Sequence, residues 1–512
     1  MIQLTLKELA IAAQGQIVCS EQKATKSEEF VNEVVIDSRS ILVNQANETK
    51  AFLALKGPTF DGHNFVAQVV KNGCCVVIVD HEQDIVSDVH VTQIIVDDTH
   101  KALGQIGAYV KAKVQPKTIG ITGSSGKTTL KEMLAAILSN LGCVLSTNGN
   151  FNNDIGVPLT LLRLENKHEF AVIEMGANHA GEIAYTTNLV KPDIAIINNI
   201  AEAHLEGFGD LCGVANAKGE IYAGLSDKGI AIYNQNSPFT EKWQWRLKDK
   251  VVRTVSCNNQ EQENQQEKPD CFSSDVQLDA TGCALFTLHT PIGNKNIKLT
   301  IPGIHNVCNA VTAACGAIEL GASLDDIALG LSQVGQVSGR LNLHHLSETL
   351  TLVDDTYNAN VESVKAATAL LASYKSFNIL ILGDMGELGE ESVKYHQEIG
   401  VYASEQSINA LLTLGSLSKE TSNMFAKQSA LKGFDYDAEH FDEQKLLLEA
   451  LVQIINRHKK SNNLDENNSP NTSISILVKG SRSAHMERVV ENIISWHNKL
   501  NKTTCQQKED NV

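Results

Sequence analysis

Residues 117–129, KTIGITGSSGKTT, determine the fold class. Residues 117–122 form a short, mostly apolar run that predicts a buried strand, and a helix is expected over about 127–140. The glycines between them let the backbone wrap around an anion, and a helix N-terminus directs N–H groups at it. The stretch therefore predicts an α/β fold with a phosphate-binding loop.

The loop departs from the strict G-x-x-x-x-G-K-[ST] spacing, because Ile121 stands where the first glycine should be. Its mechanics are intact, since Lys127 can reach the outer phosphates and Thr128 can ligate Mg²⁺. An ordinary glycine-rich turn is the alternative, which the Lys-Thr-Thr run and the flanking strand disfavour. The residues expected to hold nucleotide phosphates are Gly123, Ser124, Ser125, Gly126, Lys127, Thr128 and Thr129.

Strands alternate with helical segments along the rest of the chain, which predicts parallel, doubly wound sheets. Three α/β units are expected, over residues 1–114, 115–338 and 339–512. The strands expected in the second and third units lie at 170–174, 194–198, 350–354, 379–382, 410–414 and 474–478, and the first unit ends in a strand at 93–97.

The composition excludes several classes of protein. The 512 residues are 42% hydrophobic and 20% charged, as in ordinary globular proteins, and the net charge of −17 disfavours binding to nucleic acid or to an anionic membrane. The longest apolar run, residues 74–79, is too short for a membrane span. The N-terminus lacks the apolar region of a signal peptide, so a cytoplasmic location is expected.

Several smaller features also carry expectations. The eleven cysteines, without a C-x-x-C pair, indicate reduced thiols mostly in cores, with Cys74 and Cys75 inside a strand. Trp243 and Trp245 are expected to pack. Polar composition predicts mobile surface loops at 258–270 and 459–471 and a frayed end from residue 503.

Two residues after strands are candidate metal ligands. Glu174 ends a predicted strand beside the phosphate loop, where a carboxylate suits Mg²⁺. A carboxylate at a strand end is otherwise more often a surface or capping group. His204 also follows a strand, but a lone histidine is usually packed or solvated, so its spacing alone does not favour metal binding.

Several motifs, in order along nearly the whole chain, resemble those of the Mur ligases. They are TNGNFNNDIGVPL at 147–159, EMGAN at 174–178, AHLE at 203–206, AKGE at 217–220, GIHN at 303–306 with Asn309, GRL at 339–341, DDTYNAN at 354–360, LGDMGEL at 382–388 and VKGSR at 478–482. Within the family the resemblance is strongest to the ligase that joins D-Ala-D-Ala to UDP-N-acetylmuramoyl-tripeptide.

The resemblance implies an N-terminal domain for the UDP end of the precursor, a central ATPase domain and a C-terminal Rossmann-like domain. It places Ser38, Arg39 and Lys56, near Asp61 and His63, in the uridine-nucleotide domain. A capped turn and a hairpin explain these residues equally well. The other residues expected near the substrate are Thr147, Asn150, Asn152, Asn153, Asn358 and Asn360.

The same resemblance assigns roles around ATP and two Mg²⁺ ions. Lys127 and Thr128 meet the phosphates and a metal, Glu174 binds that metal and His204 binds a second. Lys218 matches a lysine that is carbamylated in several members, and an ordinary ammonium is the alternative. A carbamate is an anionic oxygen ligand suited to a hard cation.

Further positions concern the rest of the nucleotide and the third domain. Asn306 and Asn309 resemble adenine-facing asparagines, although they could be helix caps. Arg340 resembles the arginine that reaches the γ-phosphate on domain closure, and Asp355 resembles the ribose-binding carboxylate near Tyr357. Two further groups remain in this part of the chain. Val361 departs from the family pattern, in which proline is common at this position. Lys479, Ser481 and Arg482 are expected either to face the dipeptide or the nucleotide, or to cap the end of a strand.

The implied reaction is ATP-driven amide formation through an acyl phosphate. The alternatives are a sister Mur ligase or a folylpolyglutamate synthase, a P-loop ATPase acting as a motor or switch, and a binding protein with a relict loop. A monomer without nucleic-acid partners is expected. The sequence leaves open whether residue three of the precursor is meso-diaminopimelate or lysine.

Overall fold

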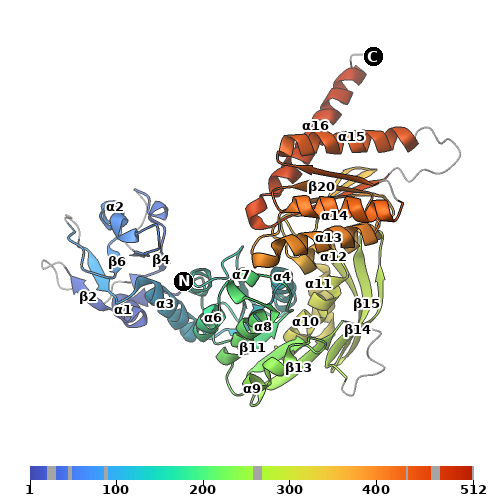
Figure 1. The fold of residues 1–512 in the computed structure, drawn as a ribbon. Coiled ribbons are helices and arrows are strands. Elements are labelled where there is room, and N and C mark those ends of the chain that lie inside the picture. Colours follow the sequence, from blue (N-terminus) through green and yellow to red (C-terminus); the bar gives the residue numbers. More distant parts are fainter. Residues whose placement is uncertain are drawn as a thin grey trace.

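The computed structural model describes residues 1–19, 30–43, 49–85, 90–257, 268–433, 436–462 and 473–509. Three large sheets of the described residues follow one another along the chain, with the N-terminal unit and the C-terminal unit at opposite ends of the central one (Figure 1). The α/β fold class and the three-domain architecture with parallel sheets are confirmed.

The N-terminal unit contains a five-stranded sheet in the order β2-β7-β6-β5-β4, in which only the β2–β7 pair is antiparallel. A two-stranded sheet, β1 with β3, lies beside it. The elements are β1 Leu4–Thr5, α1 Leu6–Ala13, β2 Gln16–Cys19, β3 Phe30–Val31, β4 Glu33–Val35, β5 Lys50–Leu53, α2 Val66–Lys71, β6 Val76–Val79, β7 Thr92–Ile95 and α3 Thr99–Val114. The short helical turns η1 Ser38–Ser40 and η2 Gly62–Phe65 follow β4 and β5.

The central sheet has nine strands in the order β16-β15-β14-β13-β12-β11-β8-β10-β9. Pairing is parallel from β9 to β14, and β14, β15 and β16 form an antiparallel meander that the sequence pattern did not predict. The strands are β8 Lys117–Thr122, β9 Val144–Ser146, β10 Phe170–Glu174, β11 Ile194–Ile197, β12 Ile230–Asn234, β13 Val251–Ser256, β14 Cys271–Leu278, β15 Cys283–Thr290 and β16 Gly293–Pro302.

Helices cover both faces of this sheet because its strands are apolar on both faces. Ile119 and Ile121 pack in a cluster with α4, α10 and α11, whereas Ala171 and Ile173 pack in a cluster with α3, α5 and α6. The helices are α4 Lys127–Leu138, α5 Gly156–Leu162, α6 Glu182–Val190, α7 Leu205–Phe208, α8 Leu211–Gly219, α9 Gln244–Leu247, α10 His305–Glu319 and α11 Leu324–Ser332.

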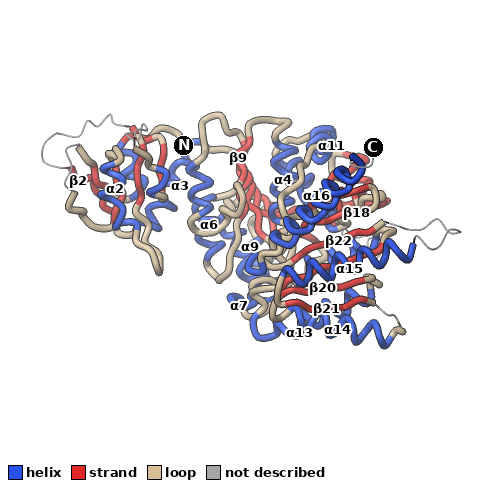
Figure 2. Tube along the Cα trace, turned by 90° about the horizontal axis from the view of Figure 1, so that it is seen from above, coloured by secondary structure: helices blue, strands red, loops and turns tan. Residues whose placement is uncertain are grey.

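The C-terminal sheet has six strands in the order β17-β18-β22-β19-β20-β21, antiparallel only at β17–β18. Helices α12, α13 and α14 pack on one face, and α15 and α16 on the other, as Figure 1 shows from the side, whereas Figure 2 gives the view from above. The elements are β17 Asn342–Ser347, β18 Leu350–Asp355, α12 Val361–Ser373, β19 Phe377–Gly383, α13 Ser392–Glu405, β20 Ala410–Leu414, α14 Ser418–Leu431, β21 Asp437–Phe441, α15 Gln444–Asn462, β22 Ile474–Lys479 and α16 Glu487–Glu509.

The expectation of reduced cysteines is wrong for one pair. Cys257, after β13, and Cys308, in the first turn of α10, form a disulfide across 51 residues of sequence. Their spacing gave no signal, because the sheet brings the two positions together only in three dimensions. Cys74 and Cys75 lie just before β6 rather than within it.

Three smaller expectations are also corrected. Trp243 is buried as expected, but Trp245 is 70% exposed. Helix α15 continues through residues 459–462, and the backbone of α16 is helical to Glu509, because helical periodicity persists into these polar segments. Of the two expected loops, residues 258–267 and 463–471 lie outside the described residues. Among the helices that are described, none is long and apolar enough to cross a bilayer.

Candidate functional site

The predicted phosphate loop connects β8 to α4 as expected, and its geometry requires glycine at Gly126. This residue has φ +72°, and a Cβ atom there would lie 2.7 Å from Nδ2 of Asn198 and 2.8 Å from Oδ1 of Asn309. Both its backbone conformation and the lack of space exclude a side chain. The loop is thus packed tightly against two asparagines that the fold brings to it.

Two consecutive asparagines after β11 hold the loop in place. The Asn199 backbone carbonyl accepts the N–H of Ser124 (3.0 Å), and its side-chain oxygen accepts the N–H of Ser125 (2.8 Å). The Asn198 amide donates to the Ser125 carbonyl (3.0 Å) and to Oδ1 of Asn309 (2.9 Å). The loop is therefore pre-organised by the neighbouring strand, as a rigid anion site requires.

Lys127 is the first residue of α4, and its ammonium donates to the Gly123 carbonyl (2.7 Å). Burial lowers the pKa of Lys127, the Glu174 carboxylate opposes this, and the nearby Arg340 adds to the lowering. The charge of Lys127 thus lies within the electrostatic reach of groups from both the central and the C-terminal unit.

A buried oxygen cluster lies beside the loop at the end of β10. The two carboxylate oxygens of Glu174 accept from the Thr128 hydroxyl (2.9 Å) and from the Asn152 amide (2.8 Å). The Thr147 hydroxyl accepts the backbone N–H of Glu174 (3.0 Å). A carboxylate and a hydroxyl in contact are hard oxygen donors of the kind that Mg²⁺ prefers, so this pair fits that ion.

His204 connects the central unit to the C-terminal one. It is the N-cap of α7 with φ +56°, and its Nδ1 is in close ion-pair contact with the Glu387 carboxylate. The Glu206 N–H donates to the Glu387 backbone carbonyl (3.4 Å). The imidazole contact lowers the pKa of Glu387, against the effect of burial. Glu387 belongs to the LGDMGEL motif, but no role was predicted for it.

Lys218, in α8, is 1% exposed. Burial, and then repulsion by Lys127, lower its pKa well below the usual value. Its ammonium nitrogen lies 5.9 Å from the centre of the Phe208 ring. A buried cation close to a second cation is electrostatically unfavourable.

The first turn of α10 carries the expected adenine-facing residues. The Asn306 amide donates to the Pro302 carbonyl (2.7 Å), and the Asn309 amide donates to Oδ1 of Asn306 (2.9 Å). Beside them, burial lowers the pKa of His305 to about 4, and the Lys479 charge adds to the lowering. The Nδ1 atom of His305 is buried and has no hydrogen-bond partner within the described chain.

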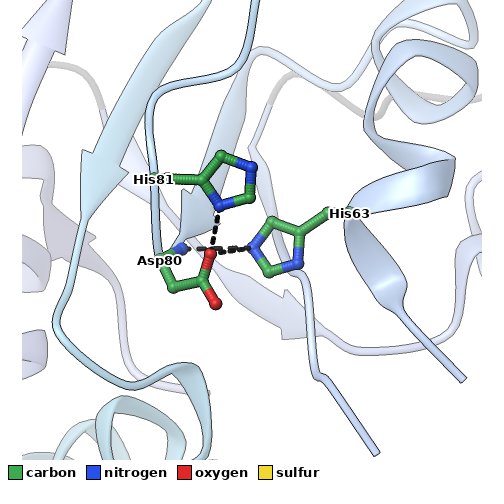
Figure 3. Close-up of side chains that lie close together, drawn as sticks. All are labelled: His63, Asp80 and His81. Carbon is green, nitrogen blue, oxygen red and sulfur yellow. Dashed lines mark hydrogen bonds and ion pairs between the residues drawn. The ribbon is translucent and has the colours of Figure 1, made fainter.

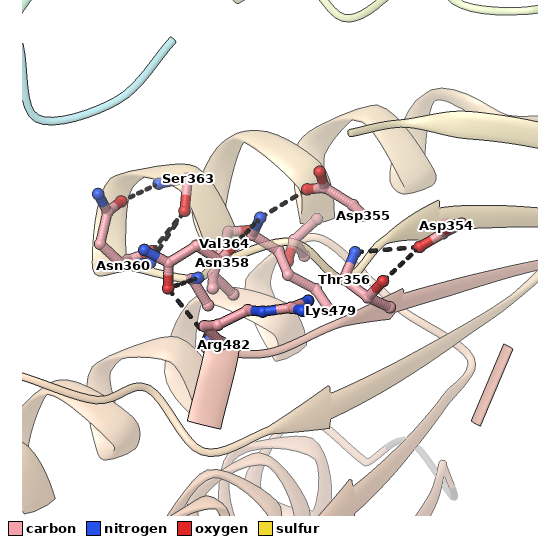
Figure 4. A network of polar contacts seen from close by, with 11 residues as sticks. Asp354, Asp355, Thr356, Asn358, Asn360, Ser363, Val364, Lys479 and Arg482 are labelled. Atoms are coloured by element: carbon pink, nitrogen blue, oxygen red, sulfur yellow. Dashed lines mark hydrogen bonds and ion pairs between the residues drawn. The ribbon is translucent and has the colours of Figure 1, made fainter. Parts of the chain in front are cut away.

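The hinge and the first strands of the C-terminal unit contribute a second group of residues. The Arg340 guanidinium stacks 4.2 Å from the centre of the Tyr357 ring. Among the described residues its Nε has no hydrogen-bond partner, although it is buried. Asp355 pairs with Lys479 (2.6 Å), and burial raises the pKa of Asp355 in spite of Lys479 and Arg340 (Figure 4).

The loop after β18 is fixed by its own polar groups, which Figure 4 shows side by side. Asn360 caps α12, with its Oδ1 accepting the N–H of Ser363 (2.8 Å). The Asn358 carbonyl accepts from Lys479 (2.9 Å), and its side-chain oxygen accepts the N–H of Ala359 (2.9 Å). Val361 opens the helix at the position where proline would suit the backbone.

A cleft of about 780 Å³ between the central and C-terminal units brings most of the predicted residues together. Those that line it are Ser124, Ser125, Gly126, Lys127, Thr128, Thr129, Asn150, Asn152, Asn153, Glu174, His204, Asn306, Asn309, Arg340, Asp355, Asn358 and Asn360. Gly123, Thr147 and Lys218 are outside this lining, although Gly123 and Thr147 contact residues within it.

Asn198, Asn199 and His305 also line the cleft, and no role was predicted for them. The signal for the two asparagines was present, because they follow a parallel strand at the edge where its neighbours end in site residues. His305 lies within the GIHN motif, but nothing in the spacing showed that its ring would be half-buried with an enclosed Nδ1.

The N-terminal candidates do not line the cleft. Arg39 lies in η1 with its side chain 89% exposed and forms an ion pair with Asp37 (2.8 Å). Arg39 hydrogen bonds lower the pKa of Asp37. Ser38 lies in the same turn, and the exposed Lys56 forms a backbone bridge with Asp61.

Comparisons with known proteins match nearly the whole length of the chain. Three family models match: the Mur ligase middle domain at residues 121–317, the Mur ligase glutamate ligase domain at 339–460, and the Mur ligase family catalytic domain at 31–111.

A relative from Haemophilus influenzae named UDP-N-acetylmuramoyl-tripeptide–D-alanyl-D-alanine ligase is 40% identical over 494 residues, covering 96% of this chain and 98% of the relative. A crystal structure of MurF from Acinetobacter baumannii is 38% identical, with a TM-score of 0.83 over 96% of this chain and 99% of that one. A MurF ligase from Thermotoga maritima in complex with ADP has a TM-score of 0.74 at 24% identity, over 91% and 98% of the two chains.

Proposed function

The chain belongs to the Mur ligase family, and we propose on that premise that it joins D-Ala-D-Ala to the terminal carboxylate of UDP-N-acetylmuramoyl-tripeptide. The reaction consumes ATP and gives UDP-N-acetylmuramoyl-pentapeptide for peptidoglycan synthesis, with ADP and phosphate. The observation that supports it most is the relative of this name, which is 40% identical over nearly the full length of both chains.

The predicted phosphate loop is the site that we assign to ATP. Its backbone is held open by Asn198 and Asn199, and Lys127 supplies a cation at the start of α4. A helix N-terminus and a lysine are the usual partners of nucleotide phosphates. The fold relative from Thermotoga maritima is a complex with ADP, which agrees with this assignment. Asn306 and Asn309 are the proposed contacts of the adenine, and Asp355 of the ribose.

Glu174 and Thr128 are the proposed ligands of Mg²⁺, because their oxygens lie together beside the loop. When bound, this ion withdraws negative charge from phosphate oxygens. His204 is the proposed ligand of a second Mg²⁺, which its Nε2 would hold, because Nδ1 is in contact with Glu387. Asn152 and Thr147 hold Glu174 in position, because the Asn152 amide donates to the Glu174 carboxylate and the Thr147 hydroxyl accepts the backbone N–H of Glu174.

We also propose that Lys218 is carbamylated and completes the metal site. Burial, and then repulsion by Lys127, disfavour the charged ammonium form of Lys218 and lower its pKa. A carbamate at Lys218 would be an anion, so this repulsion would become attraction and the metal would gain an oxygen ligand. Mass or ¹³C labelling with ¹³CO₂ would detect the added group, and an unmodified lysine under saturating CO₂ would contradict the assignment.

Two steps make the amide bond. The tripeptide carboxylate attacks the γ-phosphorus and ADP leaves, which gives an acyl phosphate. The neutral amine of D-Ala-D-Ala then attacks the acyl carbon, phosphate leaves, and the nitrogen loses a proton. Negative charge accumulates at the transferred phosphoryl group, and cations placed there beforehand stabilise it.

Arg340 is placed to contribute to that stabilisation when the units close on the substrates. Its guanidinium lies in the cleft beside Tyr357 with a buried, unpartnered Nε among the described residues, so it has a free donor to offer an anion. A guanidinium binds phosphate oxygens in a fixed geometry. Closure would also exclude water, which would otherwise hydrolyse the acyl phosphate.

The remaining assignments rest on the family. Ser38, Arg39 and Lys56 bind the UDP end of the precursor, and Asn150, Asn153, Asn358 and Asn360 contact the substrates. The enzyme acts in the cytoplasm as a monomer, and the three domains span residues 1–114, 115–338 and 339–512.

Phosphate release and product mass test the proposed function directly. With Mg²⁺, ATP and UDP-N-acetylmuramoyl-tripeptide, stoichiometric phosphate and the pentapeptide product are expected only when D-Ala-D-Ala is added. Turnover with a single amino acid in place of the dipeptide would show that the enzyme has the specificity of another Mur ligase. Phosphate release that is independent of any acceptor would contradict a ligase.

A further inference from the structure

Two histidines and an aspartate, His63, His81 and Asp80, lie close together at one end of the N-terminal sheet. None of the three lines the cleft between the central and C-terminal units. Asp80 and His81 directly follow β6, and His63 lies in η2. One ligand atom of each lies within 4.8 Å of those of the other two. Figure 3 shows both imidazole rings directing a nitrogen at the Asp80 carboxylate.

Hydrogen bonding fixes the proton on His63. Its Nδ1 lies 2.6 Å from Oδ1 of Asp61, and because a carboxylate can only accept, the proton between them belongs to Nδ1. The other nitrogen, Nε2, then carries a lone pair in the neutral ring. Asp61 thus orients His63 in the way that carboxylates commonly orient metal-binding histidines.

The lone pair of His63 faces a second acceptor. Its Nε2 lies 3.1 Å from Oδ1 of Asp80, and Nδ1 of His81 is in close contact with the same oxygen. Two acceptors at this distance repel one another unless a proton or a metal cation lies between them. Nε2 also accepts the Asp80 N–H (3.1 Å), so an incoming metal would replace that donor.

We propose that His63, Asp80 and His81 form a binding site for a divalent transition metal of the Zn²⁺ class. Zinc in a site with three protein ligands binds nitrogen and oxygen at about 2.0–2.2 Å, so tetrahedral ligands lie about 3.3 Å apart. The 3.1 Å between His63 and Asp80 is close to this spacing. Two imidazoles and a carboxylate leave a fourth position for water.

The site would fasten η2 to the end of β6. His63 is the interior ligand, with a side chain 5% exposed, whereas the side chain of His81 is 66% exposed, which gives an ion access from solvent. The two rings stack 5.0 Å apart, so both are already positioned before an ion arrives. Since the ligands come from η2 and from the end of β6, a bound ion stabilises the folded N-terminal unit relative to the unfolded chain.

Zinc binding by the full-length protein tests the proposal. Chelator-treated protein without nucleotide is titrated with Zn²⁺ against a chromophoric competitor. The wild type is expected to bind one more Zn²⁺ per chain than Asp80→Asn or His81→Ala. Ions held at Glu174 and His204 contribute equally to every variant. Zn²⁺ is also expected to raise the unfolding temperature of the wild type more than that of His81→Ala.

His485→Ala is the matched control, because His485 is similarly exposed and contacts a single carboxylate, Glu487, at 3.3 Å. It should bind zinc like the wild type. Asp61→Asn should retain the site but weaken it by about 10- to 100-fold, as loss of an orienting carboxylate does. Equal zinc stoichiometry and affinity in the wild type, Asp80→Asn and His81→Ala would overturn the proposal. A proton, rather than a metal ion, would then lie between Nε2 of His63 and Oδ1 of Asp80.

Discussion

The charged groups of the central cleft and those of the N-terminal candidates are held in different ways. In the cleft, Lys127 and Glu174 are fixed by backbone and side-chain partners from neighbouring strands. In the N-terminal unit, the Arg39 side chain is 89% exposed and pairs with Asp37, two residues away. The first arrangement is pre-organised for a reaction, and the second can be rearranged by whatever ligand binds.

This difference predicts how much each residue contributes to the rate of the reaction and to the binding of the precursor. Fixed charges with few solvent contacts act strongly on a reacting group, because no reorganisation is needed at the moment of reaction. Exposed ion pairs contribute little, since water and salt screen them. Substitutions in the cleft should therefore change the rate of the chemical step, and those in the N-terminal unit should change only the binding of the precursor.

Replacement of Lys127 by alanine should have the largest effect. It removes the cation at the start of α4, and kcat for acceptor-dependent phosphate release is expected to fall about 10³-fold. Lys56→Ala is the comparison, since Lys56 is exposed and lies outside the cleft. Product mass and phosphate release measure both variants. If Lys56→Ala lowered kcat as much as Lys127→Ala, the two regions would not differ as described.

Glu174→Gln should lower kcat by about 10²-fold and shift the Mg²⁺ dependence to higher concentration. Glutamine keeps the shape of the side chain but removes the negative charge that a hard cation needs. Thr128 and His204 remain, so high Mg²⁺ should restore part of the activity. Asp37→Asn, which removes an exposed carboxylate, should keep the wild-type Mg²⁺ dependence. An unchanged Mg²⁺ profile in Glu174→Gln would exclude Glu174 as a ligand.

The sequence predicted the parallel sheets well because their strands are apolar runs buried on both faces. Strands β10 and β20 coincide with the segments expected at 170–174 and 410–414. The β14–β16 meander was missed because its strands are polar on the outer face and so are not continuous apolar runs, although Ile297, Leu299 and Ile301 of β16 alternate with exposed residues. Helix α15 extends to Asn462, past the start of the loop expected at 459, because the polar composition of these residues indicates a loop but does not prevent a helix.

The site was predictable where local sequence fixes local geometry. A strand, a glycine turn and a helix place Gly126, Lys127 and Thr128 together without help from distant residues. Contacts between remote segments gave no such signal, as with His204 and Glu387 or the disulfide between Cys257 and Cys308. Only the three-dimensional arrangement of the sheets brings those pairs into contact.

As the pH falls, protonation of His305 in the cleft should reduce the stability of the folded chain before the Asp37–Arg39 ion pair is affected. The folded pKa of His305, about 4, lies below the usual value of 6.5, so the unfolded chain takes up the proton first as the pH falls. Stability present above pH 6.5 is then lost progressively between pH 6.5 and 4. The full difference corresponds to about 3 kcal/mol, and solvent access to the half-buried ring reduces the expected loss to about 2 kcal/mol.

Urea unfolding at pH 7.5 and pH 5 measures this loss. His305→Gln should remove the part of the decrease that His305 contributes, whereas the part from other buried histidines whose pKa is lowered, such as His396, should remain. Asp37→Asn should not, because the lowered pKa of Asp37 makes its contribution disappear only below the ordinary range of a carboxyl group. Equal pH dependence in the wild type and in His305→Gln would show that other groups control the acid sensitivity of the cleft.

Arg39→Ala should have the smallest effect of the four. The Asp37–Arg39 pair is exposed, so its loss should change the stability of the fold by less than about 1 kcal/mol. The KM for UDP-N-acetylmuramoyl-tripeptide should rise by about tenfold or less, through loss of one solvent-screened contact, whereas kcat and the KM for ATP stay at wild-type values. Steady-state kinetics with each substrate varied in turn separates these parameters. A fall in kcat comparable to that of Lys127→Ala would mean that η1 moves into the cleft during turnover, and the two regions would then form one reaction centre.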